Sequence, residues 1–295
     1  MNLVKRIFMM LMLLPVSSVS FAVSLGEVHH QVNVITSHLE TIKKHSAPDK
    51  LSRTVSVQVG KTSLHAYSKA LDLLEKIAKY QAEKGLAVVE IPSLPVKKVR
   101  SKHLMKIVQL TLQEVEKISQ SLNLTVKPIK GDDKSKTASD LYGQIWQASY
   151  LMDTLVSPMS MDDVRRNNVK IAQGINDIAK RLDKEIDTQA LQTFKGKQAV
   201  DVTIGLYKLL YKLADLERKI KLKPLVVPNF PTGDIQAADA YEVGSSVVAD
   251  LTRIALKLKI PPIQAGDDIG VTSSDIDTLY AQVHQLNVSA ERLIK

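Results

Sequence analysis

The basic side chains are the clearest candidates for chemistry in this chain, because they are numerous and gather in two places. Forty lysines and arginines stand against 31 acidic residues, which gives a formal net charge of +9. One group surrounds the start of a predicted helix at 104–122, and the other follows one side of a predicted helix at 202–220. The candidate anion- or partner-binding residues are Lys97, Lys98, Arg100, Lys102, Lys106, Lys208, Lys212, Lys219 and Lys223.

Two interpretations of these basic groups stay open. A run of cations can simply keep a helix face solvated and the protein soluble. However, cations at a helix start face the positive pole of the helix dipole, which is locally unfavourable and favours a binding role. The predicted partner is then an anionic ligand, an envelope polymer or an acidic protein. Nucleic acid is not expected, because only 4% of the residues are aromatic and could stack on bases.

Histidines and paired aspartates raise the question of a metal site. His30, His38 and His45 fall on one side of the first predicted helix, but their spacing places successive rings about two turns apart, too far for one ion. The acidic pairs at 132–133 and 267–268 offer adjacent carboxylates, whereas a calcium loop needs about six oxygen ligands. The sequence therefore predicts no metal ion and no cofactor.

Catalysis has little support in the sequence. The chain has no cysteine, which excludes thiol chemistry and disulfide bonds. It also lacks the G-x-S-x-G, H-E-x-x-H and Gly-rich phosphate-loop motifs. Trp146, the single tryptophan, is expected to pack at the edge of a core. We therefore expect a protein that is not an enzyme.

Residues 1–22 have the pattern of a secretory signal peptide. Lys5 and Arg6 precede an apolar run at 7–14, and Ser20-Phe21-Ala22 is a small-x-small cleavage site. A membrane-spanning helix needs about 18 consecutive apolar residues, and the sequence after residue 22 contains no such stretch. These features predict cleavage after Ala22 and a periplasmic or secreted protein without a transmembrane segment.

The elements that must position these residues are helices. Apolar residues recur at spacings of three and four, and no segment alternates like a strand, so the predicted class is all-α. Ser/Thr-x-x-Asp/Glu capping boxes open four of the helices, at residues 24, 137, 160 and 272. The predicted helices are 24–47, 62–84, 104–122, 137–155, 160–182, 202–220, 241–258 and 272–293.

An internal repeat organises these helices. The segment at 91–95, IPSLP, returns 136 residues later as VPNFP at 227–231. We predict a signal peptide at 1–22, a first four-helix unit at 23–157 and a second at 158–295. Short connections favour antiparallel neighbours, as two up-down bundles or as one continuous array of helical hairpins. Leu94 and Phe230, between the repeated prolines, are expected to be buried.

Together these features predict an exported, non-enzymatic binding protein. Its ligand would be anionic, or its partner a protein or envelope polymer, and the groove between the two halves is the expected place. The alternative is a structural or assembly component of an envelope complex or a homo-oligomer. The oligomeric state stays open.

Overall fold

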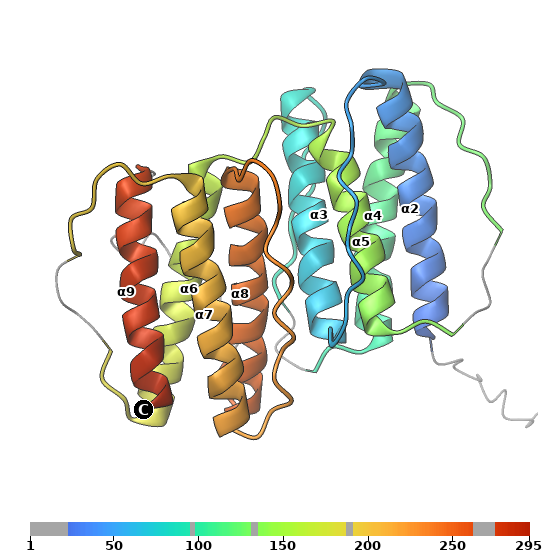
Figure 1. The fold of residues 1–295 in the computed structure, drawn as a ribbon. Coiled ribbons are helices and arrows are strands. Elements are labelled where there is room, and N and C mark those ends of the chain that lie inside the picture. The colour runs from blue at the N-terminus through green and yellow to red at the C-terminus, as the bar shows by residue number, and fades with distance from the viewer. Residues whose placement is uncertain (1–22, 95–97, 131–134, 187–190, 262–274) are drawn as a thin grey trace, which may run out of the picture.

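The computed structural model describes residues 23–94, 98–130, 135–186, 191–261 and 275–295. Within these ranges the chain forms eight α-helices and no strand, which confirms the predicted all-α class (Figure 1). The predicted signal peptide, Lys97 and both acidic pairs lie outside the described residues. The helices are α2 (Leu25–Ser46), α3 (Ser63–Glu83), α4 (Ser101–Ser121), α5 (Ala138–Asp153), α6 (Met161–Leu182), α7 (Ala199–Lys219), α8 (Ala237–Lys257) and α9 (Ile276–Ile294).

The helix starts follow the capping chemistry of the sequence in three of four cases. The predicted boxes of α2, α5 and α6 are present, with reciprocal side-chain and backbone hydrogen bonds. The fourth prediction is wrong. Asp275 itself caps α9 by accepting a hydrogen bond of 3.1 Å from the backbone N–H of Thr278. The helix therefore starts at Ile276, and Thr272 lies outside the described residues.

The eight helices form two units, each with its own hydrophobic core. Helices α2–α5 enclose one core and α6–α9 enclose the other. In each unit the first and second helices both pack on the third and fourth, while the first and second do not pack on each other, nor do the third and fourth. The pairing is the same in both units, as expected of a repeat, and it excludes an array of consecutive hairpins in the described part of the chain.

All four helices of a unit run in the same direction, so the predicted antiparallel arrangement is wrong (Figure 1). At one end of the first unit, the Ser101 hydroxyl donates to the carbonyl of Val23, which joins the starts of α4 and α2. In the second unit, Lys219 Nζ donates over 2.7 Å to the carbonyl of Ile294, which joins the ends of α7 and α9.

Long extended connections make this parallel arrangement possible. The segments between successive helices of a unit have about 16 residues, which can span about 50 Å when extended, whereas a 21-residue helix is about 32 Å long. Each connection can therefore return along the whole unit and start the next helix at the same end. The prolines at 92 and 228 favour this extended course, because proline cannot continue a helix.

The two units run in opposite directions and meet along one pair of helices. A short link at 154–160 joins the end of α5 to the start of α6 (Figure 1). Helix α3 then packs antiparallel on α8, and this is the one helix pair in the described residues that joins the units. We call this contact the seam. Beside the seam, the connection from α2 to α3 touches the connection from α7 to α8. Gly60 of the first connection has φ of +69°, and a Cβ at this position would lie 2.9 Å from Val226 Cγ2 of the second.

The residues between the repeated prolines differ in their burial. Leu94 is half-buried against the first core. Phe230 is 39% exposed and packs on Tyr207, with ring centroids 5.0 Å apart. The prediction that both side chains are buried is wrong for Phe230. The connection between α7 and α8, which carries Phe230, lines a cavity instead of covering the core.

Candidate functional site

The seam contains buried charges that form a cluster around Glu242 of α8. The Glu242 carboxylate accepts hydrogen bonds from Lys69 Nζ and, over 3.0 Å, from Lys76 Nζ, both of α3. Lys69 also pairs with Asp72 at 2.9 Å, and Lys76 with Asp153 of α5 at 2.6 Å. The side chains of Lys69 and Lys76 are only 2% and 1% exposed, whereas Asp153 at the edge of the cluster is 30% exposed. We call this group the Glu242 cluster.

Burial and charge act against each other in the Glu242 cluster. Burial alone would raise the pKa of Glu242, but the charges of Lys69 and Lys76 outweigh it and lower the pKa to about 2. For Asp72 burial prevails over the nearby Lys69 and raises the pKa to about 6. Burial would lower the pKa of Lys69, yet Glu242 and Asp72 hold it well above its ordinary value. Glu242 is therefore the ionised centre of the cluster at neutral pH.

A second group of ionisable residues lies at the other end of the seam. The backbone N–H of Thr62 donates to Nδ1 of His65, so Nε2 of His65 carries the proton and donates to Asp250 at 2.9 Å. Arg253 pairs with Glu217 at the end of α7 and lies 3.8 Å from Asp250. Burial, followed by the charge of Asp250, raises the pKa of Glu217 to about 7 in spite of Arg253.

A groove opens beside this second group, where the start of α3 meets the end of α8. We call it the basic groove; its volume is about 1040 Å³. Its apolar lining comes from both units and includes Leu64, Val99, Leu222, Leu256 and Ile260. Its cations are Lys98, Lys223, Arg253, Lys257 and Lys259, and none of its described lining residues is acidic.

The four lysines of the basic groove differ from its arginine. Arg253 is neutralised by Glu217 and Asp250, and one of its N–H groups donates over 2.6 Å to the carbonyl of Lys223. The lysine side chains are exposed, and within the described part of the chain none of them forms an ion pair with a carboxylate. The groove thus combines an apolar floor with an uncompensated positive rim, which fits a ligand with an apolar body and an anionic end.

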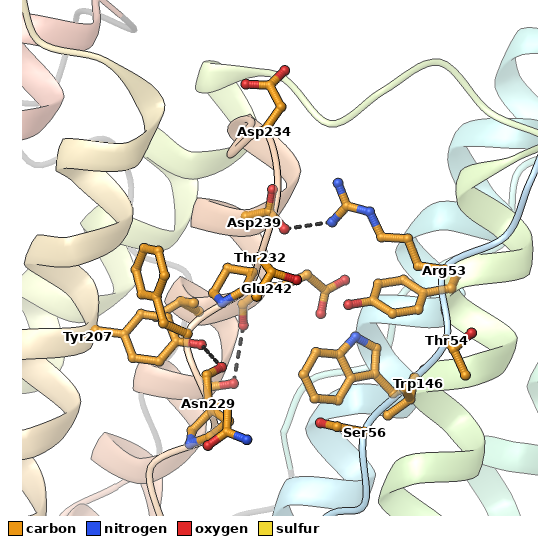
Figure 2. A pocket seen from close by; sticks show the side chains of 17 residues that line it. Arg53, Thr54, Ser56, Trp146, Tyr207, Asn229, Thr232, Asp234, Asp239 and Glu242 are labelled. Atoms are coloured by element: carbon orange, nitrogen blue, oxygen red, sulfur yellow. Dashed lines mark hydrogen bonds and ion pairs between the residues drawn. The ribbon is translucent and has the colours of Figure 1, made fainter.

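A second cavity has a volume of about 580 Å³, and we call it the aromatic pocket. It lies between the connection from α2 to α3 in the first unit and the connection from α7 to α8 in the second. Trp146 and Tyr150 of α5 line it from the first unit, and Tyr207 and Phe230 from the second. Figure 2 shows Trp146 and Tyr207 on opposite sides with Glu242 between them. Its other polar lining residues are Arg53, Thr54, Ser56, Asn229, Thr232, Asp234, Asp239 and Ser246.

The structure separates the predicted basic residues that it describes into four sets. Lys98 and Lys223 come together in the basic groove, one from each unit. Lys212 and Lys219 instead donate to backbone carbonyls of α9. Lys208 is exposed elsewhere on α7.

The remaining predicted cations lie around the start of α4. Arg100, Lys102 and Lys106 are exposed there. Burial and then the charges of these three residues lower the pKa of His103, as expected where cations gather at a helix start. These residues do not line either cavity.

The described residues offer neither a metal-binding cluster nor a membrane-spanning helix. No group of three or more His, Asp or Glu side chains could hold a metal ion there. His38 instead hydrogen-bonds to the Ser119 hydroxyl at 2.8 Å. No helix in the described ranges is both long and apolar enough to cross a membrane.

Sequence reasoning missed the seam and the aromatic pocket. Lys69, Asp72 and Lys76 are spaced by three and four residues, which is typical of a solvated helix face, although here they face α8. Trp146 was expected only to pack at a core edge. The centroid of its ring lies 5.6 Å from that of Tyr142 and 5.7 Å from that of Tyr150. Trp146 also lines the aromatic pocket. The many small residues of α8, such as Gly244, were a usable signal that this helix is covered on several sides.

Comparisons with known proteins leave the site to be interpreted from its own geometry. No protein-family model, no curated protein and no solved structure matches this chain.

Proposed function

We propose that this chain is an exported, non-enzymatic binding protein that holds an anionic amphiphile in the basic groove. The observation that carries the proposal is the combination of exposed lysines from both units with an apolar floor, without an acidic lining residue in the described chain. Export rests on the signal-like pattern of residues 1–22.

The charge of the groove favours an anionic end group. Lys98 and Lys223 approach it from opposite units, and Lys257 and Lys259 continue the rim along the end of α8. Exposed like charges repel each other, so a single bound anion would relieve several unfavourable interactions together. Arg253 contributes less, because its charge is already neutralised within the protein.

The floor favours an apolar tail. Leu64 and Val99 are buried side chains of the first unit that reach the groove, and Leu256 of α8 packs against the first core. Covering such a floor contributes about 25 cal/mol per Å² of apolar surface removed from water. A volume of about 1040 Å³ lies slightly above the range for small-ligand sites, about 300–1,000 Å³, and leaves room for an extended alkyl chain.

Isothermal titration calorimetry with dodecyl phosphate, below its micelle concentration, tests the proposal. The neutral comparison ligand is a polyethylene glycol dodecyl ether, which has the same tail without the charge. We expect saturable binding of the phosphate that weakens as salt is raised, because salt screens exposed charges over about 8–10 Å. The neutral ether should bind at least about tenfold more weakly.

Matched charge reversals locate the binding site. The double variant Lys98→Glu/Lys223→Glu changes the groove, whereas Lys106→Glu/Lys208→Glu makes the same change in net charge at exposed residues outside it. Only the groove variant should lose about tenfold or more in affinity for dodecyl phosphate. Equal losses in both variants, or equal binding of phosphate and ether, would refute recognition of an anion in this groove.

A further inference from the structure

We infer that the aromatic pocket is a second, separate binding site and that it takes a short neutral saccharide. This inference does not depend on the proposed function of the basic groove, because the two cavities share no lining residue. Its evidence is the type, pairing and placement of the side chains that the two units bring together.

The two buried carboxylates of the aromatic pocket are already paired with cations of the protein, whereas the exposed Asp234 at its mouth forms no ion pair within the described residues. Asp239 pairs with Arg53 at 2.6 Å, and Glu242 is neutralised by Lys69 and Lys76. An anionic ligand would meet two buried carboxylates, so the pocket disfavours it. This balance contrasts with the uncompensated lysines of the basic groove.

The position that a cationic ligand would use is also taken. Lys69 Nζ lies 5.3 Å from the centroid of the Trp146 ring, and the Arg53 guanidinium lies 6.0 Å from the centroid of Tyr150. These are the distances of cation–π contacts, so the protein's own cations already take one face of Trp146 and one of Tyr150, the rings of the first unit that line the pocket. A ligand without net charge is therefore favoured.

The remaining groups suit a polyhydroxylated ring. A sugar has C–H faces that pack on aromatic rings, and its hydroxyl groups both donate and accept hydrogen bonds. Tyr207 and Phe230 provide aromatic surface on one side of the pocket and Trp146 on the other (Figure 2). Trp146 Nε1 is buried and has no hydrogen-bond acceptor in the described structure.

Polar groups that could hold the sugar hydroxyls lie at the mouth of the pocket. Arg53 bonds Asp239 through one nitrogen and its side chain is 48% exposed, so its other donors can reach a ligand. Asp234 is exposed and lines the pocket from the connection between α7 and α8. A volume of about 580 Å³ lies within the range of about 300–1,000 Å³ for small-ligand sites.

Intrinsic fluorescence tests this inference directly, because Trp146 is the only tryptophan in the chain. The probes are maltose, cellobiose and N,N′-diacetylchitobiose, each titrated into the full mature chain. We expect at least one of them to change the Trp146 emission in a saturable way. No saturable change with any of the three, by fluorescence and by calorimetry, would overturn the inference.

Variants then assign the binding to the pocket. Phe230→Ala removes a half-exposed aromatic wall and Asp234→Ala an exposed carboxylate, so both should fold, which circular dichroism checks. Each should weaken saccharide binding by about tenfold, since an aromatic contact or a charged hydrogen bond contributes about 1–2 kcal/mol. Tyr211→Ala removes an aromatic ring that is 61% exposed on α7 outside the pocket, and it should not change the affinity.

Two further outcomes would contradict the saccharide assignment. Saturation of the Trp146 signal by tetramethylammonium, with no response to the saccharides, would show a cation site instead. Saccharide binding that is unchanged in both Phe230→Ala and Asp234→Ala would place the sugar elsewhere on the protein.

Discussion

Replacing Glu242 by glutamine tests whether buried charge holds the two units together. Glutamine keeps the shape of the side chain but removes the charge that Lys69 and Lys76 share. These lysines are almost fully buried, so water cannot replace the lost carboxylate. Removing one partner of a buried ion pair costs about 3–5 kcal/mol. This loss is large beside a typical total stability of about 5–15 kcal/mol.

Urea unfolding at neutral pH, followed by circular dichroism, measures this loss. Glu40→Gln on α2 is the matched control, because it makes the same chemical change at an exposed position and should alter stability by about 0.5 kcal/mol or less. Lys69→Met should also destabilise the protein. The double variant Lys69→Met/Glu242→Gln should lose about 1–3 kcal/mol less than the sum of the single losses, since the two groups contact each other.

Acid provides an independent measurement of the same contribution. The folded-state pKa of Glu242, about 2, lies below the ordinary value of 4.5, so its stabilisation is present above pH 4.5 and is lost as the pH falls toward 2. Glu242→Gln should remove this part of the acid sensitivity. A destabilisation below about 1 kcal/mol for Glu242→Gln, or strict additivity in the double variant, would refute the view that charge stabilises the seam.

Three further predictions follow from other parts of the structure. The pKa of Glu217 is raised from 4.5 to about 7, so its contribution to stability falls as the pH rises between these values. Glu217→Gln should therefore flatten the dependence of the unfolding free energy on pH from about 5 to 8. An unchanged slope would exclude Glu217 as the titrating group. Gly60→Ala should destabilise by about 1–2 kcal/mol in thermal unfolding, because of its positive φ and the contact with Val226; Val226→Ala added to it should restore only the part due to the contact. Leu94→Ala and Phe230→Ala should each cost only about 1 kcal/mol in urea unfolding, because both side chains are partly exposed, and a loss above about 3 kcal/mol for Phe230 would restore the prediction of a buried connection.

Helices and their ends could be predicted from the sequence because the signals are local. Apolar spacing identified all eight described helices, and three capping boxes appear where they were expected. The error at α9 has a local cause as well. Both Thr272 and Asp275 are good N-cap residues, and spacing alone cannot choose between two caps three residues apart.

The direction of the helices could not be predicted in the same way. A connection of about 16 residues is compatible with an antiparallel neighbour and is also long enough to return along a helix. The prolines at 92 and 228 exclude helix and favour an extended backbone, but they do not fix where the chain goes. The choice depends on packing between residues far apart in the chain.

Of the residues that line the cavities, the sequence predicted only a few as binding residues, because contacts between distant parts of the chain form both cavities. Lys98 and Lys223 could be chosen by charge, but nothing local distinguishes them from Lys106 or Lys208. Only the opposite direction of the second unit brings the end of α8 to the start of α3 and so brings these two lysines together. Trp146 likewise becomes a pocket residue because the connection of the other unit, with Asn229 and Thr232, lies across the pocket from it (Figure 2).

A polar seam has a consequence that an apolar one would lack. The hydrophobic effect has no preferred direction, so in an apolar seam only the shapes of the packed side chains would fix the register. Here His65 near the start of α3 bonds Asp250 in the second half of α8, while Lys76 in the second half of α3 bonds Glu242 in the first half of α8. A slide of one helical turn, about 5.4 Å, would break both ends together. Both cavities are lined by residues of the two units, so their shapes depend on this register, and the buried charges that fix it also maintain the cavities.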